Sequence, residues 1–437
     1  MQRRSFITMS LALPAALGAG RARAADRVEL CRDVLLTWHR LILELVRHTA
    51  TYSPPVSSRA FAYIGITAHE ALATGNPALV SLAGQLTELQ PLPRFLAPEH
   101  DPAIVLNAAL AAAVRALFDN TGPTGQRAMA AMAERLVATT SDGVPAETVR
   151  ASTAAGEAVA LHILAWAGAD LGAVVENLGF PREYTPGTRP QDWVPTSLVR
   201  LQQAPLLPNW GLNRPFALPS VEACTLPPPP AYDETPGSAF HAAALEVAEI
   251  GRALTDEQKL IARFWSDDPM LSPTPPGHWI AVLTGIAERD GLSAEVTAAA
   301  LAKIGVAQAD AFIACWATKY EYNLLRPVTY IKRHIDPKWE PLLITPPFPE
   351  YPSGHSAQSG AVATVLTTIF GDDFAFDDET HVDDGLAARS FPSFAAAATE
   401  AASSRLYGGI HYRFGNEAGL VQGACVGAYA AALRTEA

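Results

Sequence analysis

Apolar side chains recur every three to four residues along nearly the whole chain, and no other feature restricts its fold as strongly. Val34, Trp38 and Leu45 share one face of an early segment, and alanine-rich segments at 103–118 and 146–169 have the same period. This spacing is that of an amphipathic α-helix, whereas half-buried strands alternate at every second residue. No segment keeps a period of two. The sequence therefore predicts an all-α assembly of helical bundles.

Residues 1–24 have the composition of an export signal. Arg3 and Arg4 precede a short apolar run, and small residues around Ala24 suit a signal peptidase. The apolar run is shorter than the ~20 residues that a membrane-spanning helix needs. We expect cleavage of a twin-arginine signal peptide after Ala24, and a mature protein that is periplasmic or secreted.

The rest of the chain divides into three regions. Residues 25–178 and 238–437 have helical period, whereas residues 179–237 lack it and are rich in proline, with four consecutive prolines at 227–230. We expect an N-terminal helical region, a proline-rich connection and a C-terminal helical region that is catalytic. The connection is either a surface link between two bundles or a flap that shapes the mouth of a pocket.

Charge and cysteine spacing limit the possible partners. The formal net charge of -12 argues against a nucleic-acid partner, whose backbone selects for a basic surface. Cys31, Cys224, Cys315 and Cys425 show no C-x-x-C spacing, so they do not predict a zinc site. Export permits disulfides, but Cys315 and Cys425 lie in apolar helical patterns, where a buried free thiol is at least as much expected.

Two segments near the C-terminus have simple structural interpretations. Gly419, Gly423 and Gly427 repeat every four residues, which predicts close helix packing rather than a membrane span, for which 418–433 is short. The acidic stretch 372–384 matches no standard calcium loop. We therefore expect a solvent-exposed turn there.

A first cluster of charged residues lies at 319–327. Lys319 and Arg326 are seven positions apart, about two helical turns, and are expected to point from one helix face. Pro327 disfavours helical geometry at the preceding residue, so Arg326 should lie at a helix end, where its guanidinium can turn toward a ligand. Such pairs are common on surfaces, and this cluster indicates little by itself.

A second cluster, Pro352-Ser353-Gly354-His355, precedes a helical run. Unpaired amides and the dipole at a helix start favour an anion there. Ser353 adds a hydroxyl donor, Gly354 lets the backbone come close, and His355 titrates near neutral pH. The glycine spacing of a serine-hydrolase nucleophile elbow is absent. The segment therefore predicts an anion site rather than a serine nucleophile.

In a third cluster, Arg405 ends an alanine-rich helix, a Gly-Gly pair breaks that helix, and His411 follows. The three clusters together meet one requirement, the binding of a tetrahedral oxyanion by Lys319, Arg326 and Arg405. We expect these cations to serve the anion, while apolar helix faces supply the stability of the fold.

In this order the three clusters resemble the signature motifs shared by vanadium-dependent haloperoxidases and type 2 phosphatidic acid phosphatases. The resemblance implies an oxyanion site made of Lys319, Arg326, Arg405, Ser353 and Gly354. It also implies that His355 is the acid/base group and that His411 bonds to vanadium or attacks phosphorus. One pocket suits both chemistries because vanadate adopts the shape of a phosphoryl-transfer transition state.

Further residues resemble the haloperoxidase branch. Trp316 and Phe348 are similar to the aromatic pocket wall of fungal and bacterial chloroperoxidases. The segment 264–278 is similar to the one whose aspartate pairs with the last arginine in those enzymes, which assigns Asp267 to that role, with Asp268 as the alternative. The resemblance implies a peroxidase that holds vanadate, binds hydrogen peroxide and oxidises a halide.

Two other functions stay open. One is a periplasmic acid phosphatase that uses no vanadate, forms a phosphohistidine at His411 and hydrolyses a phosphate ester. The other is an inactive helical protein that binds anions. The second gains weight from Gly415, because the superfamily usually has an aspartate there, four residues after the last histidine, to orient its ring. We expect Asn416 or Glu417 to replace that aspartate.

Overall fold

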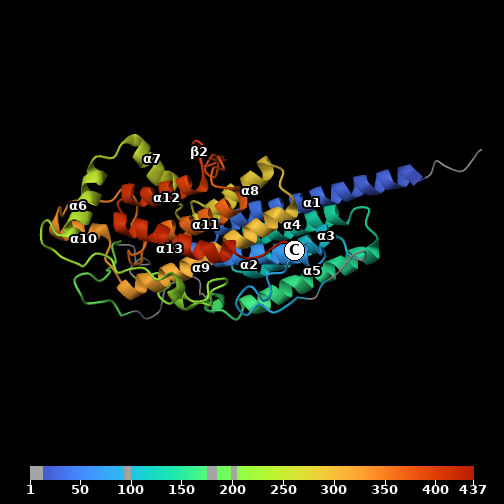
Figure 1. Ribbon diagram of the computed structural model, residues 1–437, viewed down its shortest axis with the longest axis horizontal. Helices are drawn as coiled ribbons and strands as arrows, with labels where there is room; N and C mark the ends of the chain where they lie inside the picture. Colours follow the sequence, from blue (N-terminus) through green and yellow to red (C-terminus); the bar gives the residue numbers. More distant parts are fainter. Residues whose placement is uncertain (1–12, 93, 95–99, 175–184, 198–203) are drawn as a thin grey trace, which may run out of the picture.

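The computed structural model describes residues 13–437 apart from 93, 95–99, 175–184 and 198–203. In this part of the chain thirteen α-helices form an elongated molecule (Figure 1). The first five are α1 (Leu13–His48), α2 (Pro54–Ala73), α3 (Pro102–Leu117), α4 (Pro123–Ser141) and α5 (Ala146–Ala167). The others are α6 (Ala239–Arg252), α7 (Asp256–Phe264), α8 (Thr274–Arg289), α9 (Ala294–Tyr322), α10 (Pro327–His334), α11 (Gly354–Phe370), α12 (Phe394–Tyr407) and α13 (Arg413–Ala431). The predicted all-α class is confirmed.

The remaining elements are short. Two three-residue strands pair antiparallel, β1 (Phe376–Asp378) with β2 (Arg389–Phe391). Strands of this length are too short to show a period of two, so the sequence analysis did not find them. The 3-10 helices among the described residues are η1 (Leu171–Val174), η3 (Trp210–Leu212) and η4 (Val221–Cys224).

Helix α9 lies at the centre of the molecule, packed against α2 as well as α11 and α13 (Figure 1). Among the described residues it is the one helix with the length and hydropathy of a membrane span, yet 94% of its most apolar window is buried inside the protein. An apolar core helix needs this composition because all its faces meet other helices. Its hydropathy is therefore explained by packing.

Helices α11 and α13 approach each other backbone to backbone. A Cβ atom added at Gly423 would lie 2.0 Å from the carbonyl oxygen of Ala357, and one at Gly427 would lie 2.5 Å from that of Ala361. These distances are far below van der Waals contact, so only glycine fits at both positions. The predicted close packing of the C-terminal helix is confirmed.

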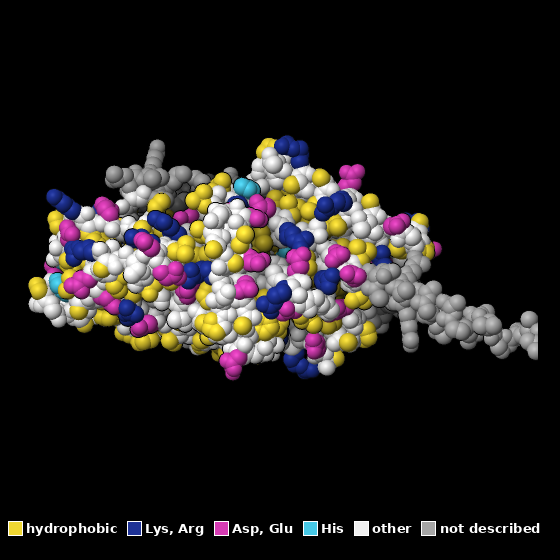
Figure 2. All heavy atoms as spheres, turned by 90° about the horizontal axis from the view of Figure 1, so that it is seen from above, with side chains coloured by type: hydrophobic (Ala, Val, Ile, Leu, Met, Phe, Trp, Pro, Cys, Tyr) yellow, Lys and Arg dark blue, Asp and Glu magenta, His cyan; other side chains and the backbone are white. Residues whose placement is uncertain are grey.

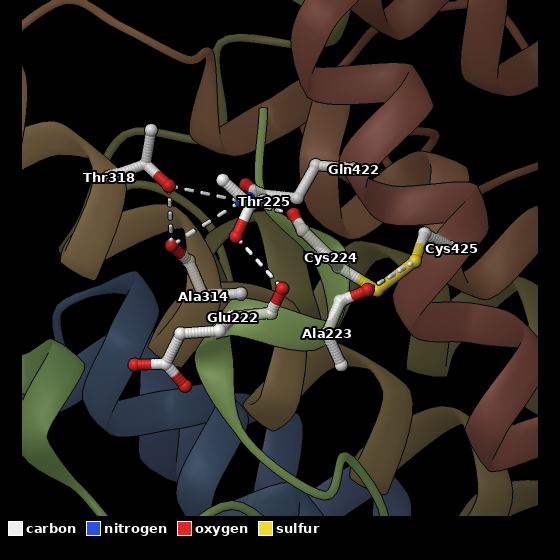
Figure 3. The surroundings of a disulfide bond; sticks show 8 residues. All are labelled: Glu222, Ala223, Cys224, Thr225, Ala314, Thr318, Gln422 and Cys425. Carbon is white, nitrogen blue, oxygen red and sulfur yellow. Dashed lines mark hydrogen bonds between the residues drawn. A yellow bond between two sulfur atoms is a disulfide. The ribbon is translucent and has the colours of Figure 1, made fainter. Parts of the chain in front are cut away.

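A disulfide joins the proline-rich connection to the last helix. Cys224 in η4 is bonded to Cys425 in α13, and Gln422 donates hydrogen bonds to the Cys224 carbonyl at 3.3 Å and to Thr318 Oγ1 at 3.1 Å (Figure 3). The expected free thiol at Cys425 was wrong, because the connection folds back onto α13, which the periodicity of α13 does not reveal. Cys315 is a buried free thiol, as expected.

The N-terminal signal is only partly within the described residues. Residues 1–12 lie outside them, and α1 already begins at Leu13. Cleavage after Ala24 therefore stays a prediction.

Candidate active site

A cavity of about 260 Å³ lies where the loops of the three motif clusters meet. Its motif-derived lining consists of Gly354, His355, Arg405 and His411, and its apolar wall includes Pro54, Leu206, Trp316, Phe348 and Pro347. Lys319, Arg326 and Ser353 are fully buried next to these lining residues. The fold thus brings together motif residues that are far apart in the sequence, the first and last of which, Lys319 and His411, are 92 positions apart.

Lys319 lies in the last turn of α9 and is bound to backbone oxygens. Its Nζ donates to the carbonyls of Pro349 at 2.9 Å and Glu350 at 3.0 Å, and also to that of Pro352. Burial, together with the charge of Arg326, lowers the pKa of Lys319 to about 7. Its ammonium fixes the loop before α11, a structural role that the sequence did not indicate, and its role toward the anion stays a prediction.

Arg326 caps the N-terminus of α10, with Pro327 at the first helical position. The expected shared helix face with Lys319 was wrong, because α9 ends at Tyr322 and Asn323 turns the chain in a left-handed conformation. Arg326 Nε donates to Phe348 O at 2.8 Å, and Nη1 donates to His411 Nε2 at 3.0 Å. Its Nη2 is buried without a hydrogen-bond partner among the described residues. One donor therefore remains for a ligand.

The second cluster starts α11, as the sequence predicted. Ser353 is the N-cap residue and its hydroxyl accepts a hydrogen bond from Ser356 N at 3.4 Å. Gly354 is the first helical residue, so its amide has no partner within the helix. His355 follows with its Nε2 buried and unpartnered among the described residues, and burial together with the charge of Arg405 holds its pKa well below 6.5. His355 is therefore a neutral imidazole.

Arg405 lies in the last turn of α12 and lines the cavity. Its Nη2 donates to Trp265 O at 2.7 Å, and its Nε donates to Ser404 Oγ at 3.0 Å. The structure gives no direct hydrogen bond or ion pair between Arg405 and Asp267 within the described residues, because Asp267 accepts from histidines. Asp267 nevertheless lines the cavity, and its charge acts on Arg405 ahead of that of Asp268 by opposing the fall in the pKa of Arg405 that burial causes. Asp268, the alternative, lines the cavity near Arg405.

His411 follows α12 and is oriented by a glutamate. Its Nδ1 donates to Glu350 Oε1 at 2.8 Å, and the same oxygen accepts from Tyr412 N at 3.1 Å. Burial raises the pKa of Glu350 to about 7, against the opposing charges of Lys319 and Arg326. Burial and nearby cations hold the pKa of His411 well below 6.5, so its ring is neutral.

Sequence reasoning missed Glu350 as the partner of His411. The two candidates for that role, Asn416 and Glu417, form no hydrogen bond with the His411 ring in the described part of the chain, so that expectation was wrong. The signal was a carboxylate just before the second cluster, in Pro349-Glu350-Tyr351. It is 61 positions before His411, so only the fold brings the two together.

The aromatic wall and the proline-rich connection meet at the cavity. The rings of Trp316 and Phe348 have centroids 4.9 Å apart, and Trp316 Nε1 donates to the carbonyl of Leu206 at 3.1 Å. Leu206 N in turn donates to Pro347 O at 2.8 Å. Part of the connection therefore forms the cavity wall. This agrees with the interpretation of the connection as a segment that shapes the pocket, and not with that of a mere surface link between bundles.

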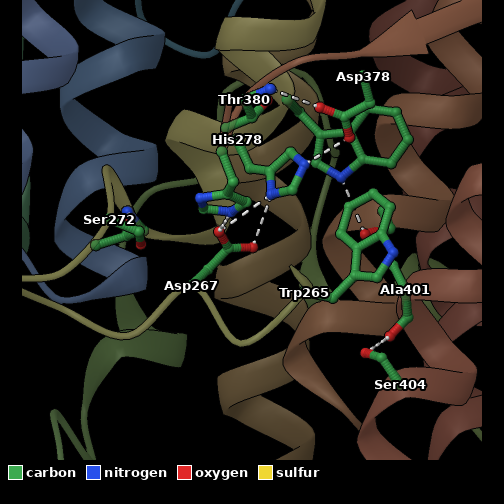
Figure 4. A network of polar contacts seen from close by, with 12 residues as sticks. Trp265, Asp267, Ser272, His278, Asp378, Thr380, Ala401 and Ser404 are labelled. Carbon is green, nitrogen blue, oxygen red and sulfur yellow. Dashed lines mark hydrogen bonds and ion pairs between the residues drawn. The ribbon is translucent and has the colours of Figure 1, made fainter. Parts of the chain in front are cut away.

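A network of buried charges lies beside the cavity (Figure 4). His278 donates to both oxygens of Asp267 at 3.0 Å and to Asp378 Oδ2 at 2.7 Å, while His381 donates to Asp267 at 3.1 Å and to Asp384 at 3.0 Å. The expected solvent-exposed turn holds for most of 372–384, but it was wrong for Asp378 and His381, which are buried partners in this network.

The same network contains the one group of metal-ligand type found among the described residues. One donor atom each of Asp267, His278 and His381 lies within 4.8 Å of the others. All of these atoms already take part in hydrogen bonds with one another. The group is therefore complete as a hydrogen-bonded ion-pair network.

The positive charge of the site contrasts with the molecular surface. Figure 2 shows acidic and basic side chains interspersed on the face in view, with no broad basic patch there. Lys319, Arg326 and Arg405 are at most 2% exposed. A buried cluster of three cations needs a compensating anion, which Glu350 supplies only in part.

An all-helical enzyme with a buried cationic oxyanion pocket is the class that this fold and site define. A family model described as the VCPO second helical-bundle domain matches residues 299–436. A solved structure described as the first bacterial vanadium-dependent iodoperoxidase is 37% identical, with a TM-score of 0.84, and the match covers 93% of this chain and 97% of that chain. The chain belongs to the vanadium-dependent haloperoxidase family.

Two further similarities are narrower. The vanadium chloroperoxidase of Curvularia inaequalis is 30% identical over 132 residues, which are 24% of this chain and 22% of that enzyme. A structure of a holo-type bacterial vanadium-dependent chloroperoxidase has a TM-score of 0.67 at 16% identity, covering 89% of this chain and 94% of that chain. The second likeness is one of fold alone.

The residues present fit vanadate. The site combines cationic donors with a neutral imidazole, and an oxyanion bound there would find the buried, unpartnered donor Arg326 Nη2. His411 lines the cavity, and its Nε2 carries a lone pair that accepts from Arg326 Nη1, so this hydrogen bond would be exchanged for the bond to a metal. Such a nitrogen can ligate a metal, and its partner Glu350 fixes the ring from the other side.

Proposed function

We propose that this protein is a vanadate-dependent haloperoxidase that uses hydrogen peroxide to oxidise a halide. The observation that carries the proposal is a neutral His411 that lines the cavity, in contact with a buried Arg326 whose Nη2 is a spare donor. Lys319 and Arg405 add positive charge, and Ser353 with Gly354 adds donors at the start of α11. Bound vanadate would supply a Lewis-acid centre that activates peroxide.

The protein's own groups hold and orient the reactants. His355 is neutral with a free Nε2, so it can take up a proton from a peroxide that enters the cavity. Trp316 and Phe348 exclude water from one side, which strengthens the attraction between the cations and an anion. The relative at 37% identity is described as an iodoperoxidase, so we propose iodide as the halide to be tested first.

Paired assays on one preparation test this function. The protein is loaded with vanadate and assayed with hydrogen peroxide and iodide, bromide or chloride, using triiodide absorbance or dye halogenation. The same protein without vanadate is assayed for hydrolysis of an aryl phosphate. Halide oxidation that depends on vanadate supports the proposal. Phosphate hydrolysis that vanadate inhibits, without halide oxidation, overturns it in favour of an acid phosphatase.

We also propose that the mature protein is exported. The paired Arg3 and Arg4 and the apolar run support this, and a disulfide between Cys224 and Cys425 suits an oxidising compartment. N-terminal sequencing of protein from the periplasm or medium should start at Ala25. Full-length protein that stays in the cytosol would contradict the proposal.

A further inference from the structure

The side chain of Glu350 fills the space that a side chain at Gly415 would need. A Cβ atom added at Gly415 would lie 2.3 Å from Glu350 Oε1 and 2.9 Å from Glu350 Cδ. This is the same oxygen that accepts the hydrogen bond from His411 Nδ1. A side chain at position 415 and the carboxylate of Glu350 therefore exclude each other.

We propose that Glu350 is the positioning residue of His411, and that it can take this role only because position 415 carries no side chain. The proposal rests on the proposed function, since it assigns His411 to the bound vanadate. Positions 350 and 415 then act as one unit, because a carboxylate at one of them requires a small residue at the other.

The hydrogen bonds on both ring nitrogens define the state of His411. Arginine has no acceptor atom, so Arg326 Nη1 at 3.0 Å requires an unprotonated Nε2. A neutral imidazole then carries its proton on Nδ1, where Glu350 Oε1 accepts it at 2.8 Å. Arg326 alone does not hold the ring against rotation, so without an acceptor at Nδ1 the ring can turn away from Arg326 and exchange tautomers. Glu350 thereby keeps Nε2 unprotonated and the ring in its orientation.

The backbone around Glu350 holds the carboxylate in place. Glu350 N donates to Leu324 O at 2.9 Å, and its carbonyl accepts from Lys319 Nζ at 3.0 Å. Ser353 N donates to Gly415 O at 2.9 Å, which ties the loop before α11 to the start of α13. The side chain is fully buried. Glu350 therefore reaches His411 from a rigid segment that also carries contacts from the first and second clusters.

A double-substitution cycle tests the pair in the full-length protein. The variants are Glu350→Ala, Gly415→Asp and the double variant, and the readouts are the vanadate Kd by equilibrium dialysis and the Tm without vanadate. Glu350→Ala should raise the Kd roughly 10- to 100-fold, the range for groups that orient a metal ligand. Gly415→Asp alone should also impair binding, because its side chain meets Glu350. The double variant should recover the Kd to within about 3-fold of the wild type.

A spectroscopic readout does not depend on vanadate. NMR spectra of protein labelled with ¹⁵N-histidine contain a signal from the His411 ring, which is assigned by its absence in His411→Ala. In the wild type and the double variant this signal should be that of a ring with its proton on Nδ1. Glu350→Ala should give an averaged signal. Asp310→Asn is the matched control, since Asp310 is a buried carboxylate that binds the amides of residues 216–218 away from the cavity. It should leave the Kd and the His411 signal unchanged.

The outcomes separate the two proposals. If the wild type binds no vanadate, the proposed function fails. If the wild type binds vanadate and Glu350→Ala binds it equally well, with an unchanged His411 signal, the positioning role of Glu350 is wrong. A double variant that is as impaired as the worse single variant would show that the two positions do not substitute for each other.

Discussion

The indole ring of Trp265 stacks on the imidazole of His278, with ring centroids 4.4 Å apart and planes inclined by 8°. The carbonyl of the same tryptophan accepts a hydrogen bond from Arg405. Trp265 therefore joins the buried charge network to the wall of the cavity. Because the network supports a residue that lines the site, its charge state affects the stability of the fold around the site.

The stability of the protein should fall at alkaline pH because of His278. Burial lowers the pKa of this histidine, but Asp267 and Asp378 outweigh burial and raise it to about 10. A folded-state pKa above the unfolded value of ~6.5 gives stability that is fully present below pH ~6.5 and is lost as pH rises through about 10. Urea unfolding of His278→Asn between pH 6.5 and 10 should show a smaller slope with pH than the wild type. His48→Asn, on the surface, should keep the wild-type slope, and equal slopes in all three proteins would contradict the prediction.

His411→Ala should abolish tight vanadate binding. The substitution removes the ring nitrogen that lies opposite the Glu350 hydrogen bond, and His355, the other histidine that lines the cavity, is assigned the acid/base role instead. Equilibrium dialysis should show a Kd at least about 100-fold higher, whereas His334→Ala at the end of α10 should bind as the wild type does. An unchanged Kd in His411→Ala would mean that another histidine holds the anion.

Arg326→Lys and Arg405→Lys should weaken the anion site although both keep the charge. Arg326 spans Phe348 O and His411 while its Nη2 stays available, and an ammonium group cannot cover these three directions at once. We expect each substitution to reduce vanadate binding by about 1–3 kcal/mol, the size of a hydrogen bond to a charged group. Isothermal titration calorimetry measures the effect. Arg413→Lys, which keeps its ion pair with Glu246 on the surface, is the control that should not change affinity.

Lys319→Met should destabilise the protein even without a ligand. Its ammonium is bound to three buried carbonyls, those of Pro349, Glu350 and Pro352, and methionine leaves them without a donor. An unsatisfied buried polar group costs about 1–3 kcal/mol, so the Tm should fall by several degrees or more. Differential scanning calorimetry of the vanadate-free protein measures this, with Lys332→Met on the surface as control. A Tm that holds or rises would show that Lys319 serves the anion alone.

Substitutions at Asp267 and Asp268 should affect different properties of the protein. Asp267→Asn breaks a buried ion-pair network and should cost about 3–5 kcal/mol of folding free energy. Asp268→Asn removes a negative charge that lines the cavity near Arg405, so it should strengthen vanadate binding roughly 3-fold with little change in stability. Unfolding curves and dialysis on both variants check this. Equal effects on stability would contradict the separation of network and pocket.

The parts of the site that depend on local sequence were predictable. Pro327 sets the start of α10 and leaves Arg326 as its cap, Ser353 starts α11, and Arg405 ends α12. Each of these features follows from the conformational preferences of a few neighbouring residues. The same local rules gave the helical class and the close packing of α13.

The partners of these residues were not predictable in the same way. Glu350 meets His411 across 61 positions, and His278 meets Asp378 across 100. Periodicity shows which face of a helix is buried but not which distant loop covers that face. The direct bond expected between Asp267 and Arg405 is missing for this reason, since Asp267 accepts from His278 and His381.

The bond between Cys224 and Cys425 makes a covalent ring of the chain between them, with a sequence separation of 201 residues. Lys319, Arg326, Ser353, His355, Arg405 and His411 all lie inside that ring. A single proteolytic cut at any loop between the two cysteines leaves both pieces attached to each other, so the site can survive a break in the main chain. The ring also closes only after Cys425 in α13 has been made, so the bond can form only once every segment that carries a motif residue has been synthesised.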